Sequence, residues 1–148
     1  MTLIRYFAIF MLSLASSSAL ANGAFTQWQA EPTRVFSAGE IELDAFKWQA
    51  RPVIIFADTD ADPRVAQQLK VLHSQTDALL ERDIVIIVDT NPDENSALRQ
   101  KLRPKGFQLV LIGKDGTVKL RKPVPWSMLA LSNLIDRMPM RREEIGQN

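Results

Sequence analysis

Three almost continuous apolar runs dominate the hydrophobic pattern of the chain. They cover residues 52–57, 84–88 and 107–112. Runs of this length are typical of strands buried on both faces, which need helices on both sides of their sheet. An alternating stretch at 118–121 follows Lys114-Asp115-Gly116-Thr117, and an Asp-Gly pair supplies the positive φ of a hairpin turn. We therefore predict a fourth strand, antiparallel to the third.

Between the predicted strands, apolar side chains recur at helical spacing. The stripe from Val65 to Leu79 predicts one helix, and Asp62 followed by Pro63 predicts its N-terminal cap. Asn91-Pro92-Asp93-Glu94 predicts the start of a second helix, because a Glu three residues after the cap completes a capping box. A third helix is expected to open at Pro125 and to stop at Pro139.

The resulting order is β-α-β-α-β-β-α. Helical crossovers are right-handed, so the first two strands should pair in parallel, while the hairpin adds an antiparallel pair. We predict a three-layer α/β/α domain over residues 43–145 with a mixed four-stranded central sheet. Residues 22–42 show no clear period and are expected to form an N-terminal arm over the domain, with one short strand near Thr33–Phe36.

The N-terminus has the layout of a secretory signal peptide. Arg5 is the only charge before residue 31, Tyr6 to Ala15 is almost wholly apolar, and Ala19-Leu20-Ala21 offers small residues for cleavage. We predict a signal peptide at 1–21 and export across the inner membrane, into the periplasm. The alternative is a retained anchor, but the apolar stretch is shorter than the ~20 residues that span a bilayer. No stable anchor is expected after cleavage.

Composition narrows the chemistry. The chain has 148 residues, of which 46% are hydrophobic and 24% charged, as in ordinary globular domains. Its net charge of +1 gives no reason to expect a nucleic-acid partner. Cysteine is absent, which excludes disulfides, a thiol nucleophile and cysteine-ligated metal sites. We expect neither a bound metal nor a cofactor.

Two resemblances extend this interpretation. The order of elements resembles the thioredoxin fold, and residues 109–121 are similar to the third and fourth strands of peroxiredoxins and exported thioredoxin-like proteins. A narrower resemblance, to the bacterial domain-of-unknown-function family 4174, covers roughly residues 43–145. The segments that carry it are Phe46-Lys47-Trp48 with Arg51, Glu81-Arg82-Asp83, Gly113-Lys114-Asp115-Gly116 and Ile135 to Arg142. This resemblance implies a thioredoxin-like fold and no established activity.

Both halves of a thioredoxin-type redox site are missing. In redox-active relatives a Cys pair follows the first strand, where the helix dipole favours the thiolate. Here the place reads Asp58-Thr59-Asp60-Ala61-Asp62. Relatives also carry a cis proline before the third strand, and here Phe107 takes that position after Gly106. The isolated chain therefore cannot exchange thiols and disulfides.

The acidic loop leaves three interpretations open. Asp62 can cap the helix while Asp58 and Asp60 are solvated. The loop can bind a divalent cation, although Pro63 and Leu69 stand where a calcium loop needs Gly and Glu. It can also serve a Mg-dependent phosphatase or hydrolase, since Asp58-x-Asp60 resembles the first motif of haloacid-dehalogenase-type enzymes. Asp62 departs from that motif. The later strands are not followed by a second pair of acids, because Asp89 has no acidic partner at its strand end.

The candidate binding residues are Asp58, Asp60, Asp62, Arg51 and Phe107. The first three and Phe107 belong to loops at one edge of the predicted sheet, where α/β proteins commonly bind ligands. Arg51 precedes the first strand and is a candidate to pair with an acid of the arm. We expect an exported, non-redox domain that binds a protein or a small ligand. The alternatives are the hydrolase using Asp58 and Asp60 and an accessory to a periplasmic redox system.

Overall fold

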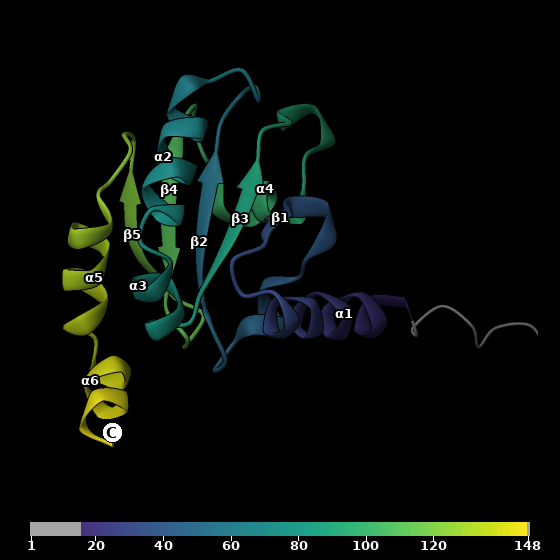
Figure 1. Ribbon diagram of the computed structural model, residues 1–148. Helices are drawn as coiled ribbons and strands as arrows, with labels where there is room; N and C mark the ends of the chain where they lie inside the picture. Colours follow the sequence, from purple (N-terminus) through teal and green to yellow (C-terminus); the bar gives the residue numbers. More distant parts are fainter. Residues whose placement is uncertain (1–15, 148) are drawn as a thin grey trace, which may run out of the picture.

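The computed structural model describes residues 16–147, and within them five strands form one mixed sheet (Figure 1). The strand order is β1-β3-β2-β4-β5. The strands are β1 Val35–Ser37, β2 Arg51–Phe56, β3 Ile84–Asp89, β4 Gln108–Ile112 and β5 Val118–Lys122. The prediction of four strands was therefore wrong by one, because the short strand expected in the arm joins the sheet beside β3.

β2 lies at the centre of the sheet and sets its polarity. It pairs in parallel with β3 along its whole length and antiparallel with β4, and β4 pairs antiparallel with β5. These pairings agree with the predicted crossover and hairpin. The residues after β2 therefore lie at one edge of the sheet, whereas the start of β2 and the β4–β5 turn lie at the opposite edge (Figure 1).

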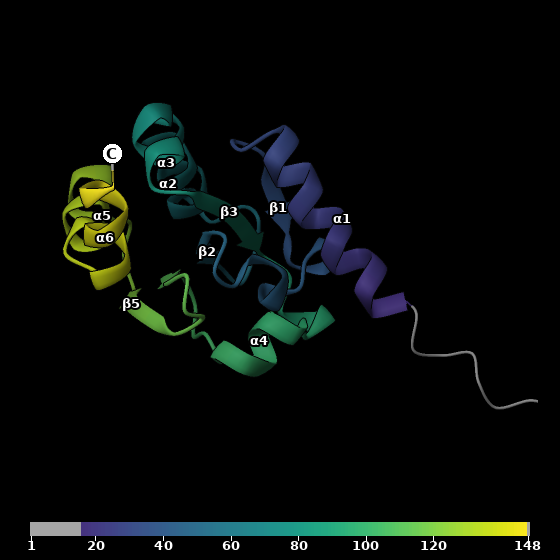
Figure 2. The same cartoon turned by 90° about the horizontal axis from the view of Figure 1, so that it is seen from below.

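Helices cover both faces of this sheet, as the apolar strands predict. The α-helices are α1 Ser16–Ala30, α2 Pro63–His73, α3 Thr76–Glu81, α4 Ala97–Leu102, α5 Met128–Asp136 and α6 Pro139–Gly146. Three 3₁₀ turns accompany them: η1 Ala38–Glu40, η2 Leu43–Phe46 and η3 Pro92–Glu94. One buried core joins α1, η2 and α4 to the sheet, and the other joins α2, α3 and α5 to its second face. Figure 2 shows α4 and the α2–α3 pair on opposite sides of the strands.

Four predicted helix boundaries differ from the structure. The helix expected to run from Val65 to Leu79 is interrupted at Gln75, whose φ of −134° and ψ of 58° are not helical. The helix after β3 begins at Ala97, because Asn95 adopts a left-handed φ of 44° and Ser96 provides the cap. The helix expected to open at Pro125 begins at Met128, because the Ser127 side chain provides its cap. This helix ends at Asp136, and Pro139, which was expected to stop it, begins α6, where its fixed φ suits the first helical position.

The N-terminal arm is more regular than its sequence indicates. α1 packs Ala24 and Trp28 into the core, and Trp28 Nε1 donates a hydrogen bond of 3.3 Å to the carbonyl oxygen of Ile84. The cleavage site expected after Ala21 lies within α1, and residues 1–15 of the expected signal peptide lie outside the described residues. Between residues 16 and 147, no helix combines the length and apolarity needed to cross a bilayer.

Candidate functional site

The acidic loop follows β2 directly and ends in a well-formed helix cap. Asp62 Oδ1 accepts a hydrogen bond of 3.0 Å from the backbone N–H of Arg64, as the cap prediction requires. The Arg64 side chain donates to the same carboxylate through Nε at 2.9 Å and through Nη2 at 2.6 Å. These hydrogen bonds lower the pKa of Asp62 and raise that of Arg64. The Asp62 carboxylate is therefore occupied by the first turn of α2 and by the Arg64 side chain.

Arg64 also connects this loop to the segment before β4. Its guanidinium carbon lies 4.9 Å from the ring centroid of Phe107, a distance at which a cation is attracted to an aromatic face. Next to Phe107, Gly106 has a φ of 58°, and a Cβ there would lie 4.0 Å from Asp58 Oδ2. The structure thus brings Asp58, Asp62 and Phe107 together, although Phe107 is only 2% exposed.

Asp58 and Asp60 remain directed to solvent. Both residues are exposed, and within residues 16–147 neither forms an ion pair. Thr59 stabilises the turn between them, because its hydroxyl accepts a hydrogen bond of 3.2 Å from the N–H of Ala61. In the same part of the chain no three His, Cys, Asp or Glu side chains gather as metal ligands would. Chemically, the loop offers two exposed carboxylates, of which Asp60 accepts a hydrogen bond of 3.4 Å from the Thr59 hydroxyl and Asp58 attracts Arg64.

A buried ion pair between Arg99 and Asp89, which the sequence analysis missed, lies next to the start of the loop. Arg99 Nε donates to Asp89 Oδ1 at 2.7 Å, and Ser96 Oγ donates to Asp89 Oδ2 at 2.5 Å. Arg99 Nη2 donates to the carbonyl oxygen of Ala57 at 2.6 Å, immediately before the loop. An acid ending a buried strand and an Arg between two core leucines are the signals that could have identified the pair.

Arg51 does not belong to this site. It stands at the start of β2, about 20 Å from Asp58 at the rise of an extended strand. The expected pairing with an acid of the arm was wrong, since Arg51 Nη2 lies 3.0 Å from Glu144 Oε1 of α6. Arg51 Nη1 also donates to the carbonyl oxygen of Arg82 at 3.0 Å.

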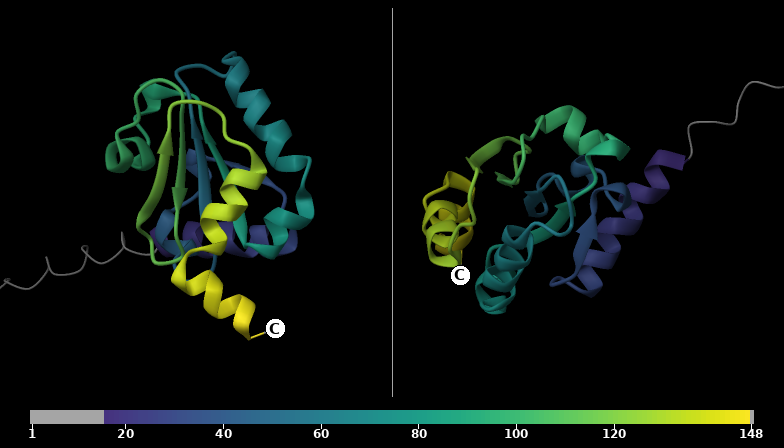
Figure 3. Two further views of the ribbon diagram at one scale, coloured as in Figure 1. Left: turned by 90° about the vertical axis from the view of Figure 1, so that its left-hand side faces the viewer. Right: turned by 90° about the horizontal axis from the view of Figure 1, so that it is seen from above.

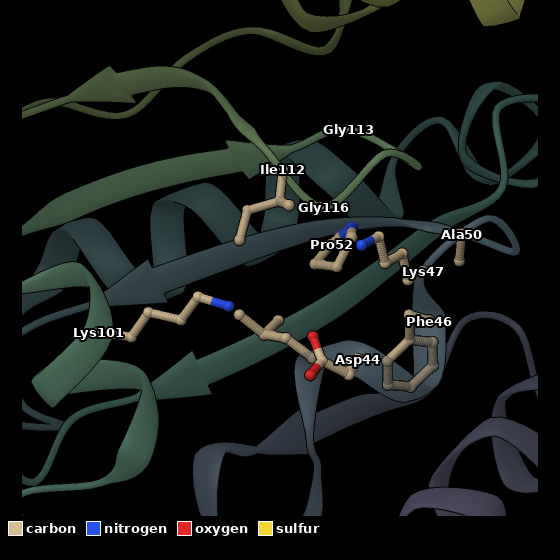
Figure 4. A pocket seen from close by; sticks show the side chains of 10 residues that line it. Asp44, Phe46, Lys47, Ala50, Pro52, Lys101, Ile112, Gly113 and Gly116 are labelled. Atoms are coloured by element: carbon tan, nitrogen blue, oxygen red, sulfur yellow. The ribbon is translucent and has the colours of Figure 1, made fainter.

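Two cavities lie away from the acidic loop. The smaller, of about 10 Å³, lies where Figure 4 shows Lys101 and Lys47 approaching from opposite sides, with Asp44 below. It holds one water molecule at most. The larger, of about 120 Å³, lies between the β4–β5 turn and the α5–α6 junction, and Arg51, Lys114 and Met138 are among its lining residues.

The fold is similar to that of a solved enzyme. The reduced 2-Cys peroxiredoxin of Plasmodium vivax superposes with a TM-score of 0.53, covering 70% of this chain and 84% of that chain. The two sequences are 14% identical, so the similarity concerns the fold alone. It confirms the thioredoxin-like fold that the sequence predicts.

A curated relative and a family model also match. Coiled-coil domain-containing protein 80 of Danio rerio is 29% identical over 134 residues, covering 70% of this chain. The chain spans only 16% of the length of that protein. The family model described as Domain of unknown function (DUF4174) matches residues 42–144. Because this match covers most of the chain, the chain belongs to the DUF4174 family.

Proposed function

We propose that this chain is an exported, non-redox thioredoxin-like domain that binds a protein partner through the acidic loop at residues 58–62. The observation that carries the proposal is the pair of exposed carboxylates, Asp58 and Asp60, held on a rigid base. Asp62 and Arg64 fix one side of the loop, and the Arg99–Asp89 pair fixes the end of β2 beneath it. A surface that is rigid before binding loses little entropy on association.

The charge of this edge indicates the chemistry of the partner. Asp58 and Asp60 lie at the same edge of the sheet as the exposed Asp93 and Glu94 of η3, which follows β3 (Figure 1). Arg64 is paired with Asp62 and also attracts Asp58, so it offsets part of this negative charge but leaves Asp60, Asp93 and Glu94 without a cation from this loop. A segment rich in Lys or Arg complements such a surface, and the association then weakens with salt.

A protein partner fits this edge better than a small ligand. Pockets for small molecules enclose most of their ligand. Neither cavity described above includes residues 58–62 among its lining residues, and the loop carboxylates project to solvent. Exposed carboxylates suit the polar rim of a protein interface, where complementary charges steer the association.

The chemistry of the loop also bears on the two alternatives. A chain without cysteine has no thiol to donate, so a role in a redox system would be limited to holding a client. A Mg-dependent hydrolase needs further acidic ligands beside Asp58 and Asp60, and Asp89 is engaged by Arg99 and Ser96. Binding without turnover therefore accounts best for these residues.

Affinity capture from the exported fraction of the source cells tests the proposal. The mature chain is compared with Asp58→Asn/Asp60→Asn and with the charge-matched control Asp77→Asn/Glu143→Gln, which changes exposed acids elsewhere. We expect one partner to be captured by the mature chain and the control, to be lost with the loop variant, and to dissociate as salt rises. Equal capture by all three proteins would contradict the proposal.

Two assays on the same proteins separate the alternatives. Mg-dependent hydrolysis of a phosphate ester that disappears in Asp58→Asn would establish the hydrolase instead. Recovery of a thiol oxidoreductase as the partner, with no reduction of insulin by this chain alone, would establish the accessory role.

A further inference from the structure

The end of the sheet opposite the acidic loop contains a buried cation. Arg51 is 1% exposed, and its guanidinium donates to both oxygens of Glu144 at 3.0 and 3.3 Å. A buried charge is costly unless it is paired. The Glu144 carboxylate, supplied by the last helix, is therefore the group that allows Arg51 to be buried at the start of β2.

Three cations from separate elements converge on this one carboxylate. Besides Arg51 of β2, Lys114 Nζ lies 2.8 Å from Glu144 Oε1, and Arg141 Nη1 lies 3.4 Å from Oε2. Burial raises the pKa of Glu144, but hydrogen bonds from Arg51 and Lys114 outweigh burial, and the pKa lies below its usual value. An oxyanion surrounded by two arginines and a lysine is a common arrangement at carboxylate and phosphate sites.

The cavity of about 120 Å³ reaches two members of this cluster, Arg51 and Lys114. Arg51 and Lys114 line it together with Lys119, whose charge is paired with Asp115 of the same lining, and Met138 and Met140 contribute apolar walls. A water molecule takes ~30 Å³, so the cavity has room for a group of the size of phosphate or acetate. Figure 3 shows α6 at the end of the chain, joined to α5 by a short connection.

The three cations depend unequally on Glu144. Lys114 Nζ also contacts Asp83 at 2.7 Å, and Arg141 also pairs with Glu81 and Asp136. Within residues 16–147, Arg51 forms an ion pair with no carboxylate besides Glu144. Loss of Glu144 would therefore leave α6 attached through Arg141 and leave Arg51 in need of another anion.

We propose that Arg51, Lys114 and Arg141 form a binding site for a small oxyanion, which Glu144 occupies as a built-in competitor. A carboxylate or phosphate group that enters through the cavity takes the place of the Glu144 side chain. Because the competitor belongs to the same chain, its effective concentration is in the ~mM range or above, which weakens the apparent affinity of the intact protein.

Thermal unfolding with phosphate, acetate or chloride at constant ionic strength tests this site. The proteins compared are the mature chain, Glu144→Ala, Glu144→Ala/Arg51→Met and the neighbouring control Glu143→Ala. We expect phosphate or acetate to raise the Tm of Glu144→Ala by about 4 °C relative to chloride at saturation. The apparent Kd should be ~10-fold or more lower than for the mature chain.

The remaining variants decide whether the cluster itself binds the anion. Glu143→Ala should respond like the mature chain, and the double variant should lose the response. An equal response in the double variant, or no difference between these anions and chloride in Glu144→Ala, would overturn the proposal. If Glu144→Ala does not fold in chloride, its recovery in phosphate or acetate supports the site, and failure in both overturns it. The relative size of the two responses distinguishes a phosphate from a carboxylate ligand.

Discussion

Arg99 of α4 lies with its Nε 2.7 Å from Asp89 Oδ1 of β3, and both side chains are buried. The same guanidinium donates to the carbonyl oxygens of Ala57 and Asp89 through Nη2. One side chain thus binds carbonyl oxygens at the ends of the two central parallel strands, and the Asp89 carbonyl oxygen also accepts a hydrogen bond of 3.0 Å from the N–H of Ala57. The acidic loop begins at the next residue after Ala57.

Replacing Arg99 with Met should strongly destabilise the domain. The substitution leaves the buried Asp89 carboxylate without its cation, and breaking a buried pair in this way costs ~3–5 kcal/mol. Urea unfolding followed by circular dichroism measures the loss. Lys101→Met, on the exposed side of the same helix, should change the unfolding free energy by less than ~0.5 kcal/mol.

A double-mutant cycle adds the single variant Asp89→Leu and the double variant Asp89→Leu/Arg99→Met. Because the double variant removes both charges, it should be more stable than Arg99→Met alone. A double variant that is as unstable as the two single losses added together would show that the charges do not stabilise one another.

The parts of the fold that could be predicted from sequence are those with local signals. Continuous apolar runs predict the buried strands, and Asp62-Pro63 predicts the start of α2. By contrast, α1 has no sequence period, and it is helical because Trp28 packs into a core formed by distant segments. The boundary after β3 was missed because Ser96 rather than Asn91 caps α4, and the Ser96 hydroxyl also donates to Asp89 at the end of β3.

The residues of the candidate site also fall into those that the sequence could place and those that it could not. Asp58, Asp62 and Phe107 could be brought together from sequence, because strand ends and helix starts fix which edge of the sheet they occupy. The position of Arg51 against Glu144 could not, since the two residues are distant in the sequence and their contact depends on how α6 packs.

The stability of the domain should fall in acid through carboxylates at the α6 end. Burial raises the pKa of Asp136, but hydrogen bonds from Arg82 and Arg141 lower it by a larger amount, so the net shift is downward. Glu144 behaves in the same way. Their folded-state pKa values therefore lie below the usual 3.8 and 4.5. Their stabilisation is present above about pH 4.5 and is lost as pH falls through the folded-state values.

Urea unfolding at several pH values measures how the free energy of unfolding changes with pH. Asp136→Asn should lower stability at neutral pH and flatten the decline in acid, because one of the titrating groups is gone. Asp77→Asn, which removes an exposed acid from α3, should leave the slope nearly unchanged. Identical pH profiles for the mature chain and Asp136→Asn would show that this carboxylate is not stabilised by folding.

Replacing Arg103 with Gly should stabilise the domain. Arg103 ends α4 with a left-handed φ of 49°, and its backbone N–H donates to the carbonyl oxygen of Arg99 at 2.8 Å. This conformation is strained for a residue with a Cβ, by about 1 kcal/mol, and glycine adopts it freely. The side chain is exposed, so little contact is lost. A matched Arg103→Ala variant keeps the Cβ and should show no such gain in urea unfolding.

From the proposed export we expect a mature chain that begins at Asn22 and retains its stability. Cleavage after Ala21 shortens α1 but keeps Ala24 and Trp28, the residues through which it joins the core. A chain that begins at Glu31 loses both, and removal of a buried Trp alone costs ~3–5 kcal/mol. N-terminal sequencing of the exported protein checks the first point, and urea unfolding of the two chains checks the second. A retained Met1 would contradict the cleavage after Ala21. Equal stability of the chains that begin at Asn22 and Glu31 would contradict the contribution of α1 to the core.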